Sequence, residues 1–199
     1  MKVFPIAGWN KLARTPKPQD PTKLCSAFSY VDDYNDKRGD FIHGATDIFT
    51  NIGTPVLAVT DGVMWANTDL GDRRDSYTYW KDGGYHAYLW GDDGFIYYYA
   101  HLLNMPLVRP GQRVSAGQLI GYADRSGNVA TCCHVHFAMY RISGGKKGAA
   151  VNPYPYLKIV EPTANPNYAV AAGIGLGTLA ILGIGGFLLW RYLRRRRNR

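Results

Sequence analysis

Short apolar runs recur along the chain, and each is ended by glycine or by a glycine-containing turn. "YHAYLW" and "FIYYYA" flank the tetrapeptide "GDDG", residues 91–94, as expected for a β-hairpin. Residues 56–59 and 63–66 flank the dipeptide Asp61-Gly62, and "GQRVSAGQLIGYA" indicates strand, turn and strand. No stretch before residue 168 keeps the 3.6-residue period of an amphipathic helix. The sequence therefore predicts an all-β or β-rich core.

The run "HVHFAMY", residues 134–140, alternates in a way that predicts one more strand. Successive side chains on a strand point to opposite faces, so Val135, Phe137 and Met139 form an apolar face and His134 and His136 share the other. The two histidines would stand about 7 Å apart at Cα. That spacing suits one metal ligand with a second imidazole beside it. A surface pair without a ligand is the alternative, because His-x-His is a short pattern.

Other candidate ligands lie elsewhere in the chain. His43 and Asp47 are four residues apart in "HGATD", and His101 ends the aromatic run "FIYYYAH". A catalytic zinc ion takes three protein ligands with nitrogen, oxygen or sulfur donors and keeps one position for water. Two histidines and one aspartate meet that requirement. Two further histidines would then remain to move protons or to stabilise an oxyanion.

These motifs, in this order, resemble the lysostaphin-type (LytM-like) zinc peptidases of family M23, which cut peptide crosslinks of bacterial cell walls. The resemblance covers roughly residues 38–158 and rests on "HGATD", "GTPVLAVTDGVM", "DGFIYYYAHL", "VRPGQRVSAGQLIGYADRSGN", "HVHF" and "NPYPYL". It implies an antiparallel sheet domain with a groove. It also implies one zinc ion held by His43, Asp47 and His136, with His101 and His134 as catalytic residues beside the water and the scissile carbonyl.

The chain departs from the family pattern at four positions near these motifs. Ala45 replaces the usual glycine of H-x-G-x-D, with Gly44 before it, and Ala138 replaces the acid that often follows H-x-H-F. Cys132 and Cys133 replace the small and proline residues before the histidine pair. None of these changes removes a ligand. We expect the cysteines to be small buried residues, because added thiolates would close the position that a catalytic zinc keeps for water.

The ends of the chain differ in composition from its middle. Residues 1–24 are proline-rich and predict an extended arm, residues 25–160 predict the peptidase domain, and residues 161–167 predict a linker. Residues 168–190 predict a transmembrane helix, because 22 of them in succession carry no charge and would span about 33 Å as a helix. A buried core helix is the alternative, and it fits such a long and uniform run less well.

The net charge of +8 comes mostly from residues 191–199, whose six arginines leave only +2 for the rest of the chain. The folded domain is therefore not expected to bind nucleic acid. An arginine tail favours the cytoplasmic side of a lipid membrane, which places the domain on the other side. No apolar signal segment opens the sequence, which conflicts with ordinary export. Gly173-x-x-x-Gly177 would allow self-association of the helix.

The leading hypothesis is a membrane-anchored zinc endopeptidase that hydrolyses peptide crosslinks of bacterial peptidoglycan. A virion-associated lysin of a membrane-containing bacteriophage, acting as the virus enters its host, would reconcile the arginine tail with the missing signal segment. A bacterial envelope enzyme is the alternative location. A non-catalytic wall-binding or structural membrane protein on the same fold is the alternative function. The retention of all five expected site residues favours the enzyme.

Two further features stay open at this level. Arg38-Gly39-Asp40 matches an adhesion tripeptide, although a turn is the simpler interpretation. The tyrosines at 97–99 would alternate between the core and the groove, and the pattern alone does not tell which of them faces the groove.

Overall fold

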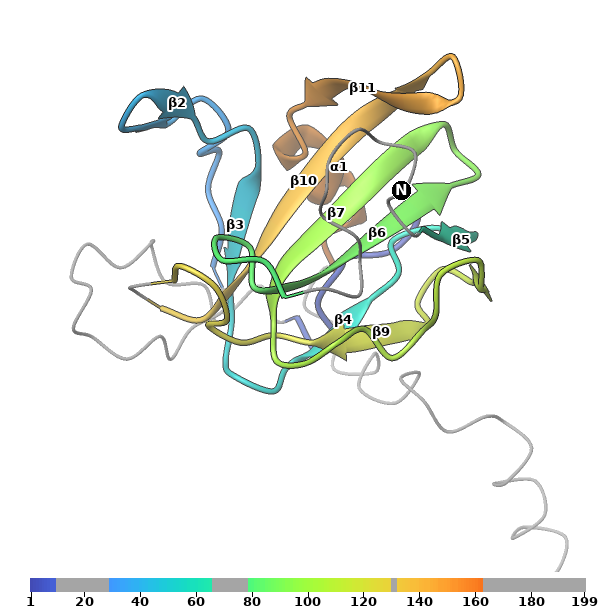
Figure 1. The fold of residues 1–199 in the computed structure, drawn as a ribbon, viewed down its shortest axis with the longest axis horizontal. Helices are drawn as coiled ribbons and strands as arrows, with labels where there is room; N and C mark the ends of the chain where they lie inside the picture. Colours follow the sequence, from blue (N-terminus) through green and yellow to red (C-terminus); the bar gives the residue numbers. More distant parts are fainter. Residues whose placement is uncertain (10–28, 66–78, 130–131, 163–199) are drawn as a thin grey trace, which may run out of the picture.

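The computed structural model describes residues 1–9, 29–65, 79–129 and 132–162. Within these ranges the centre of the fold is a seven-stranded sheet of β3 (Thr46–Phe49), β5 (Gly62–Met64), β6 (Tyr85–Gly91), β7 (Phe95–Leu102), β8 (Arg113–Val114), β10 (His134–Ser143) and β11 (Lys146–Val151). The strand order is β11-β10-β7-β6-β5-β8, and β3 pairs with β10 (Figure 1). Every pairing is antiparallel. The predicted β-rich class is confirmed.

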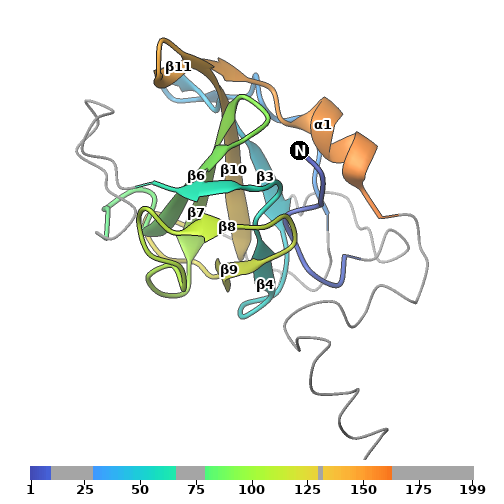
Figure 2. The ribbon, with the colours of Figure 1, turned by 90° about the vertical axis from the view of Figure 1, so that its right-hand side faces the viewer.

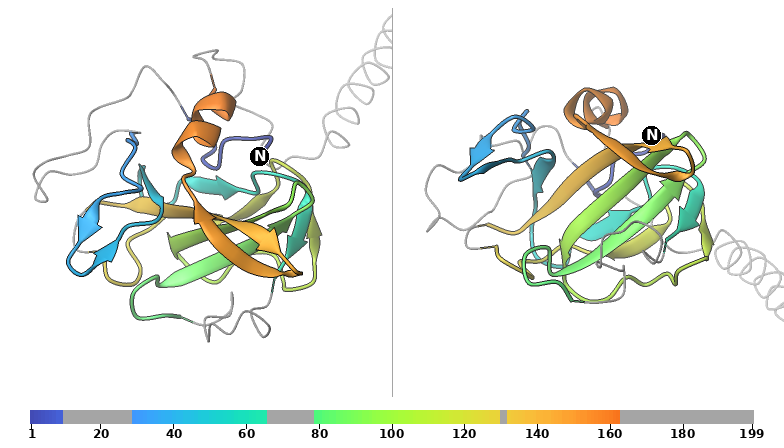
Figure 3. Two further views of the ribbon diagram at one scale, coloured as in Figure 1. Left: turned by 90° about the horizontal axis from the view of Figure 1, so that it is seen from above. Right: turned by 45° about the horizontal axis from the view of Figure 1, so that its top comes forward.

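Two small sheets and one helix complete the described part. The hairpin of β1 (Lys37–Arg38) and β2 (Phe41–Ile42) projects beside β3, and β4 (Pro55–Leu57) pairs with β9 (Leu119–Tyr122) (Figure 1). The helix α1 (Tyr154–Val160) follows β11. Figure 2 shows α1 and the N-terminal segment on the same side of the main sheet, and Figure 3 shows α1 from two further directions.

The local strand predictions hold where the sequence alternates. β6 and β7 form the predicted hairpin around Gly91 and Gly94, with Trp90 opposite Ile96. Gly94 has φ +85°, a conformation that glycine adopts without the strain of a Cβ. By contrast, β3, β11 and α1 were not predicted, because these elements have 4, 6 and 7 residues and show no clear period.

The main sheet separates a large core from the face that carries the histidines. Val135, Phe137 and Met139 of β10 are fully buried in the main core, as the alternation predicts. A second, smaller apolar cluster lies on the other face, and it includes Tyr98 and Ala138, which are paired across β7 and β10. The structure thus resolves the tyrosine run: Tyr97 and Tyr99 belong to the core and Tyr98 to the histidine face.

The first nine residues pack against the domain. Ile6 bridges to Val56 of β4, and Phe4, Ile6 and Trp9 are buried in the main core. The rest of the predicted arm, residues 10–24, lies outside the described residues, as do the linker from residue 163, the predicted transmembrane helix 168–190 and the tail 191–199. In the ranges that the structure describes, no helix is both long enough and apolar enough to cross a membrane.

Candidate metal centre

The strand register brings Asp47 and His136 together. β10 lies between β3 and β7, and His136 is opposite Asp47 on one side and Ala100 on the other. Ile48, the next residue of β3, is buried in the main core, so Asp47 faces the opposite side of the sheet, where His136 also lies. Two residues that are 89 positions apart in the chain thus become direct cross-strand neighbours.

A glycine turn before β3 adds His43 to this pair. Gly44 has φ +67°, in the left-handed region that favours glycine. The next residue, Ala45, is fully buried in the second apolar cluster. In this chain the left-handed conformation that favours glycine therefore occurs at position 44 and not at Ala45. The turn directs the buried His43 ring back toward Asp47.

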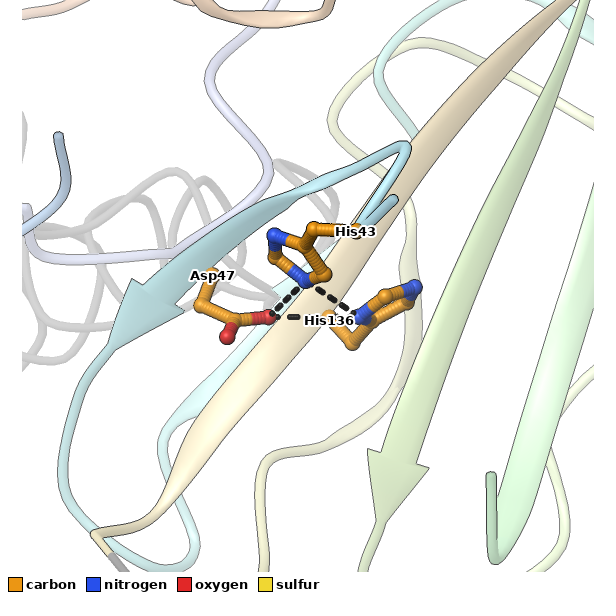
Figure 4. A group of neighbouring side chains, drawn as sticks. All are labelled: His43, Asp47 and His136. Carbon is orange, nitrogen blue, oxygen red and sulfur yellow. Dashed lines mark hydrogen bonds and ion pairs between the residues drawn. The ribbon is translucent and has the colours of Figure 1, made fainter. Parts of the chain in front are cut away.

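Three ligand atoms meet in a compact triangle (Figure 4). His43 Nε2 lies 3.1 Å from Asp47 Oδ1 and 3.1 Å from His136 Nδ1, and His136 Nδ1 lies 3.2 Å from Asp47 Oδ1. The Asp33 carbonyl accepts a hydrogen bond from His43 Nδ1, so neutral His43 presents a bare lone pair at Nε2. Three ligand atoms held this close to one another could share one cation.

The triangle fits a zinc ion. Tetrahedral ligands at the usual zinc–nitrogen and zinc–oxygen distances would stand about 3.3 Å from one another, close to the spacing found here. Two imidazoles and one carboxylate are also a ligand set that catalytic zinc uses. Within the described residues, His43, Asp47 and His136 form the group of ligand atoms suited to hold a metal. The structure thus brings together the three residues that the sequence proposed as ligands.

Asp47 is an ionised carboxylate in this setting. Burial by itself would raise its pKa, but the electrostatic interaction with the His134 ring and the hydrogen bonds with His136 and His43 hold the pKa of Asp47 well below its usual value. The ionised form is the one that binds a cation.

His101 and His134 lie beside the triangle. Their ring centroids are 4.8 Å apart, and His134 Nε2 is 3.6 Å from Asp47 Oδ1. The ring of His101 is 5.9 Å from that of His136. All five residues that the sequence selected therefore gather on one face of the sheet.

Backbone carbonyls fix the tautomers of both flanking histidines. His101 Nδ1 donates to the Ser126 carbonyl at 2.8 Å, and His134 Nδ1 donates to the Cys132 carbonyl at 2.8 Å. Burial and the neighbouring His134 and His136 lower the pKa of His101 to about 3, and burial lowers the pKa of His134. Both rings are therefore neutral at pH 7 and carry a lone pair at Nε2.

The backbone of His101 is strained. Its φ of +63° is the one positive φ of a non-glycine residue in the described ranges. The His101 amide donates to the Gly83 carbonyl and the His101 carbonyl accepts from the Asp124 amide, at 2.8 and 2.9 Å. Such strain costs of the order of 1–3 kcal/mol and persists where surrounding contacts impose it. These contacts aim the ring at the site.

The remaining histidine and the adjacent cysteines take no part in the triangle. His86 is fully buried and donates from Nδ1 to the Gly84 carbonyl. Cys133 is a free thiol whose pKa burial raises to about 12, and Cys132 is disulfide-bonded. Both cysteines are buried, as the sequence predicts.

Sequence reasoning did not find two residues that contact the ligands. Asp33 binds His43 through its carbonyl, and its carboxylate accepts the Asp47 amide at 3.3 Å. Arg38 Nη2 donates to Asp47 Oδ2 at 2.6 Å. Arg38 begins the tripeptide Arg38-Gly39-Asp40, whose turn is confirmed: it connects β1 to β2, with φ +64° at Gly39. The contacts of Arg38 and Asp33 depend on how that hairpin folds back. No sequence motif indicates them.

Comparisons with known proteins agree with this architecture. The family model of Peptidase family M23 matches residues 41–153. Over 121 residues the chain is 34% identical to the glycyl-glycine endopeptidase ALE-1 of Staphylococcus capitis, a match that covers 58% of this chain and 29% of that protein. Over 151 residues it is 28% identical to the L-Ala–D-Glu endopeptidase of Bacillus subtilis, covering 71% of this chain and 43% of that protein.

The same likeness extends to solved structures. The catalytic domain of the antimicrobial peptidase lysostaphin from Staphylococcus simulans superposes with a TM-score of 0.52 at 28% identity, covering 66% of this chain and 92% of that one. The matches span less than half the length of either curated relative. Because the family model covers more than half of the chain, this protein belongs to peptidase family M23.

Proposed function

We propose that this protein is a zinc endopeptidase that hydrolyses peptide crosslinks of bacterial peptidoglycan. The observation that carries the proposal is the triangle of His43, Asp47 and His136 with two neutral histidines beside it. Membership of family M23 supports it, and so do relatives that are named endopeptidases. Those relatives are named for different bonds, so the proposal covers peptide crosslinks as a class.

His43, Asp47 and His136 would hold the zinc ion. When bound, zinc polarises a carbonyl and lowers the pKa of a coordinated water. His101 and His134 both present a bare Nε2, because their Nδ1 protons are committed to the Ser126 and Cys132 carbonyls. At the outset each ring can therefore accept a proton and neither can donate one from Nε2.

Because both rings start neutral at Nε2, each must accept a proton before it can donate one. As water attacks the scissile carbonyl carbon, one of the two rings accepts a water proton at Nε2. The resulting imidazolium then has an Nε2–H that can stabilise negative charge on the carbonyl oxygen and protonate the leaving amine nitrogen as the C–N bond breaks. Because burial disfavours the charged ring, the proton is readily released, and the neutral state is restored after each turnover.

The test uses the full chain on purified peptidoglycan. Turbidity and the masses of released muropeptides would be followed for wild type, for wild type with a chelator, and for His136→Ala. We expect new peptide termini with wild type that are absent from both controls, and their identity would define the bond. No cleavage by folded, zinc-loaded protein would instead indicate a wall-binding or structural membrane protein.

We also propose that the protein is anchored in a membrane, with the domain on the non-cytoplasmic side, in a bacteriophage virion that contains lipid. The uncharged run at 169–190 and the six arginines after it support the anchor. Immunodetection in purified, lipid-containing particles is the expected result. Recovery only from host envelope fractions would favour a cellular envelope enzyme.

A further inference from the structure

The two oxygens of the Asp47 carboxylate have different partners. Oδ1 faces the ligand triangle, at 3.1 Å from His43 Nε2 and 3.2 Å from His136 Nδ1. Oδ2 points away from the triangle (Figure 4) and accepts a hydrogen bond from Arg38 Nη2 at 2.6 Å. A hydrogen bond between a guanidinium and a carboxylate is charge-assisted and about twice as strong as one between neutral groups. The second oxygen is therefore held by the protein.

Arg38 is itself held in place by a second carboxylate, that of Asp33. Its Nη2 lies 3.5 Å from Oδ2 of Asp33, a carboxylate that is 1% exposed. The Asp33 carboxylate also accepts the backbone amide of Asp47. Arg38 Nη2 approaches His43 Nδ1 to 3.3 Å, but that nitrogen already donates its proton to the Asp33 carbonyl, so the approach is a packing contact. The guanidinium thus bridges two buried carboxylates next to the ligands.

We propose that Arg38 is a positioning residue that restricts Asp47 to binding the metal through Oδ1 alone, so that three protein ligands and one water would leave the metal four-coordinate. The inference rests on the zinc centre of the proposed function. A carboxylate that is free to rotate can offer both oxygens to a metal ion. Asp47 would have to give up a charge-assisted hydrogen bond to do so, and Arg38 would be left near a dication with only its longer contact to Asp33.

The positive charge of Arg38 predicts that a positioning role and a purely structural role affect metal affinity in opposite directions. Arg38 places a positive charge beside a site for a divalent cation, which by itself opposes metal binding. Removing the guanidinium removes that repulsion and frees a second oxygen ligand. Loss of Arg38 would therefore leave the metal as firmly bound as before, or more firmly, while Oδ2 becomes a fifth ligand beside the water. A residue needed only for folding of the site would instead weaken metal binding when removed.

The test is visible absorption spectroscopy of the full chain loaded with Co²⁺, since four-coordinate Co²⁺ absorbs visible light more strongly than five-coordinate Co²⁺. Wild type would be compared with Arg38→Met and Arg38→Lys. Arg113→Met is the matched control, because it removes an exposed arginine that pairs with Asp92 away from the triangle. Metal affinity would be measured by competition with a chelator, and activity by amine release from solubilised peptidoglycan.

We expect Arg38→Met to bind Co²⁺ and Zn²⁺ at least as tightly as wild type, to lose visible absorption, and to lose about 10–100-fold in rate with an unchanged KM. Arg38→Lys should fall between the two, since an ammonium can donate the hydrogen bond to Asp47 but has a different shape and reach from a guanidinium. Arg113→Met should match wild type.

An unchanged Co²⁺ spectrum in Arg38→Met would overturn the inference, and so would loss of the metal or a raised KM. The two proposals fail separately. A wild-type protein that binds Co²⁺ but cleaves nothing contradicts the proposed function and leaves the spectral comparison intact. An active wild type with an Arg38→Met spectrum like its own contradicts only the role of Arg38.

Discussion

The rings of His101 and His134 lie 4.8 Å apart and meet at 68°, although one belongs to β7 and the other to β10. Each donates its Nδ1 proton to a backbone carbonyl, so both are committed to the same tautomer. Two bases therefore stand next to each other at the edge of the candidate metal site. Their separation from the ligand triangle makes the roles of the histidines testable one by one.

Substitution of a ligand and of a flanking histidine should have different effects. We expect His136→Ala to lose bound zinc, because one of three protein ligands is gone. His134→Ala should keep zinc and lose about 10²–10⁴-fold in rate, the usual contribution of a general acid or base. Zinc content after dialysis and the rate of amine release from peptidoglycan provide the comparison. Equal loss of zinc in both variants would contradict the separate roles.

A pair of glycine substitutions tests how the His101 ring is held. A Cβ at Gly84 would lie 2.2 Å from Ser126 Oγ and 2.4 Å from the Ser126 carbonyl carbon, so Gly84→Ala must displace the residue whose carbonyl binds His101. Gly94→Ala is the control, because Gly94 also has a positive φ but has open space at its Cβ. Both changes add backbone strain of about 1 kcal/mol.

We expect Gly94→Ala to lower the melting temperature slightly and to keep nearly full activity. Gly84→Ala should lose most of its activity under conditions where it is still folded, as judged by circular dichroism. If the two variants lost activity in proportion to stability, Ser126 would have no specific part in positioning His101.

Acid should destabilise the metal-free protein through His101. Its folded pKa of about 3 lies below the pKa of about 6.5 that histidine has in an unfolded chain, so the unfolded chain binds a proton in this range and the folded protein does not. This contribution to stability is complete above pH 6.5 and is lost as the pH falls toward 3, by about 1.4 kcal/mol per pH unit. His134 should act in the same direction.

Denaturant unfolding between pH 7 and 4, with a chelator present, measures this slope. His101→Asn removes one titrating group while tolerating the positive φ, and it should have a shallower slope. A slope equal to that of wild type would mean that His101 is protonated in the folded protein.

Cys133 should resist alkylation in the folded state. Its side chain is buried and its pKa is raised to about 12, so almost no reactive thiolate exists at pH 8. Iodoacetamide at pH 8 followed by peptide mass analysis should leave Cys133 unmodified, whereas the same treatment in guanidinium chloride should modify it. Rapid labelling of native protein would show that the residue is accessible.

Some of the fold was predictable because the relevant signal is local. The hairpin around Gly91 and Gly94 and the strand from His134 rest on alternation between adjacent residues, and both are present. β11 was not predicted, because its small and basic residues at a sheet edge need no apolar face. The predicted groove, membrane helix and tail remain predictions.

Residue identity and short-range periodicity were enough to predict the β-rich class, the five candidate site residues and the apolar face of Val135, Phe137 and Met139. Three relationships became visible in the folded chain alone: His136 lies opposite Asp47, Tyr98 lies on the histidine face, and Arg38 binds the second oxygen of Asp47. These contacts depend on strand register and on where a hairpin folds back. Pairing between segments far apart in the chain sets both, and no local pattern records it.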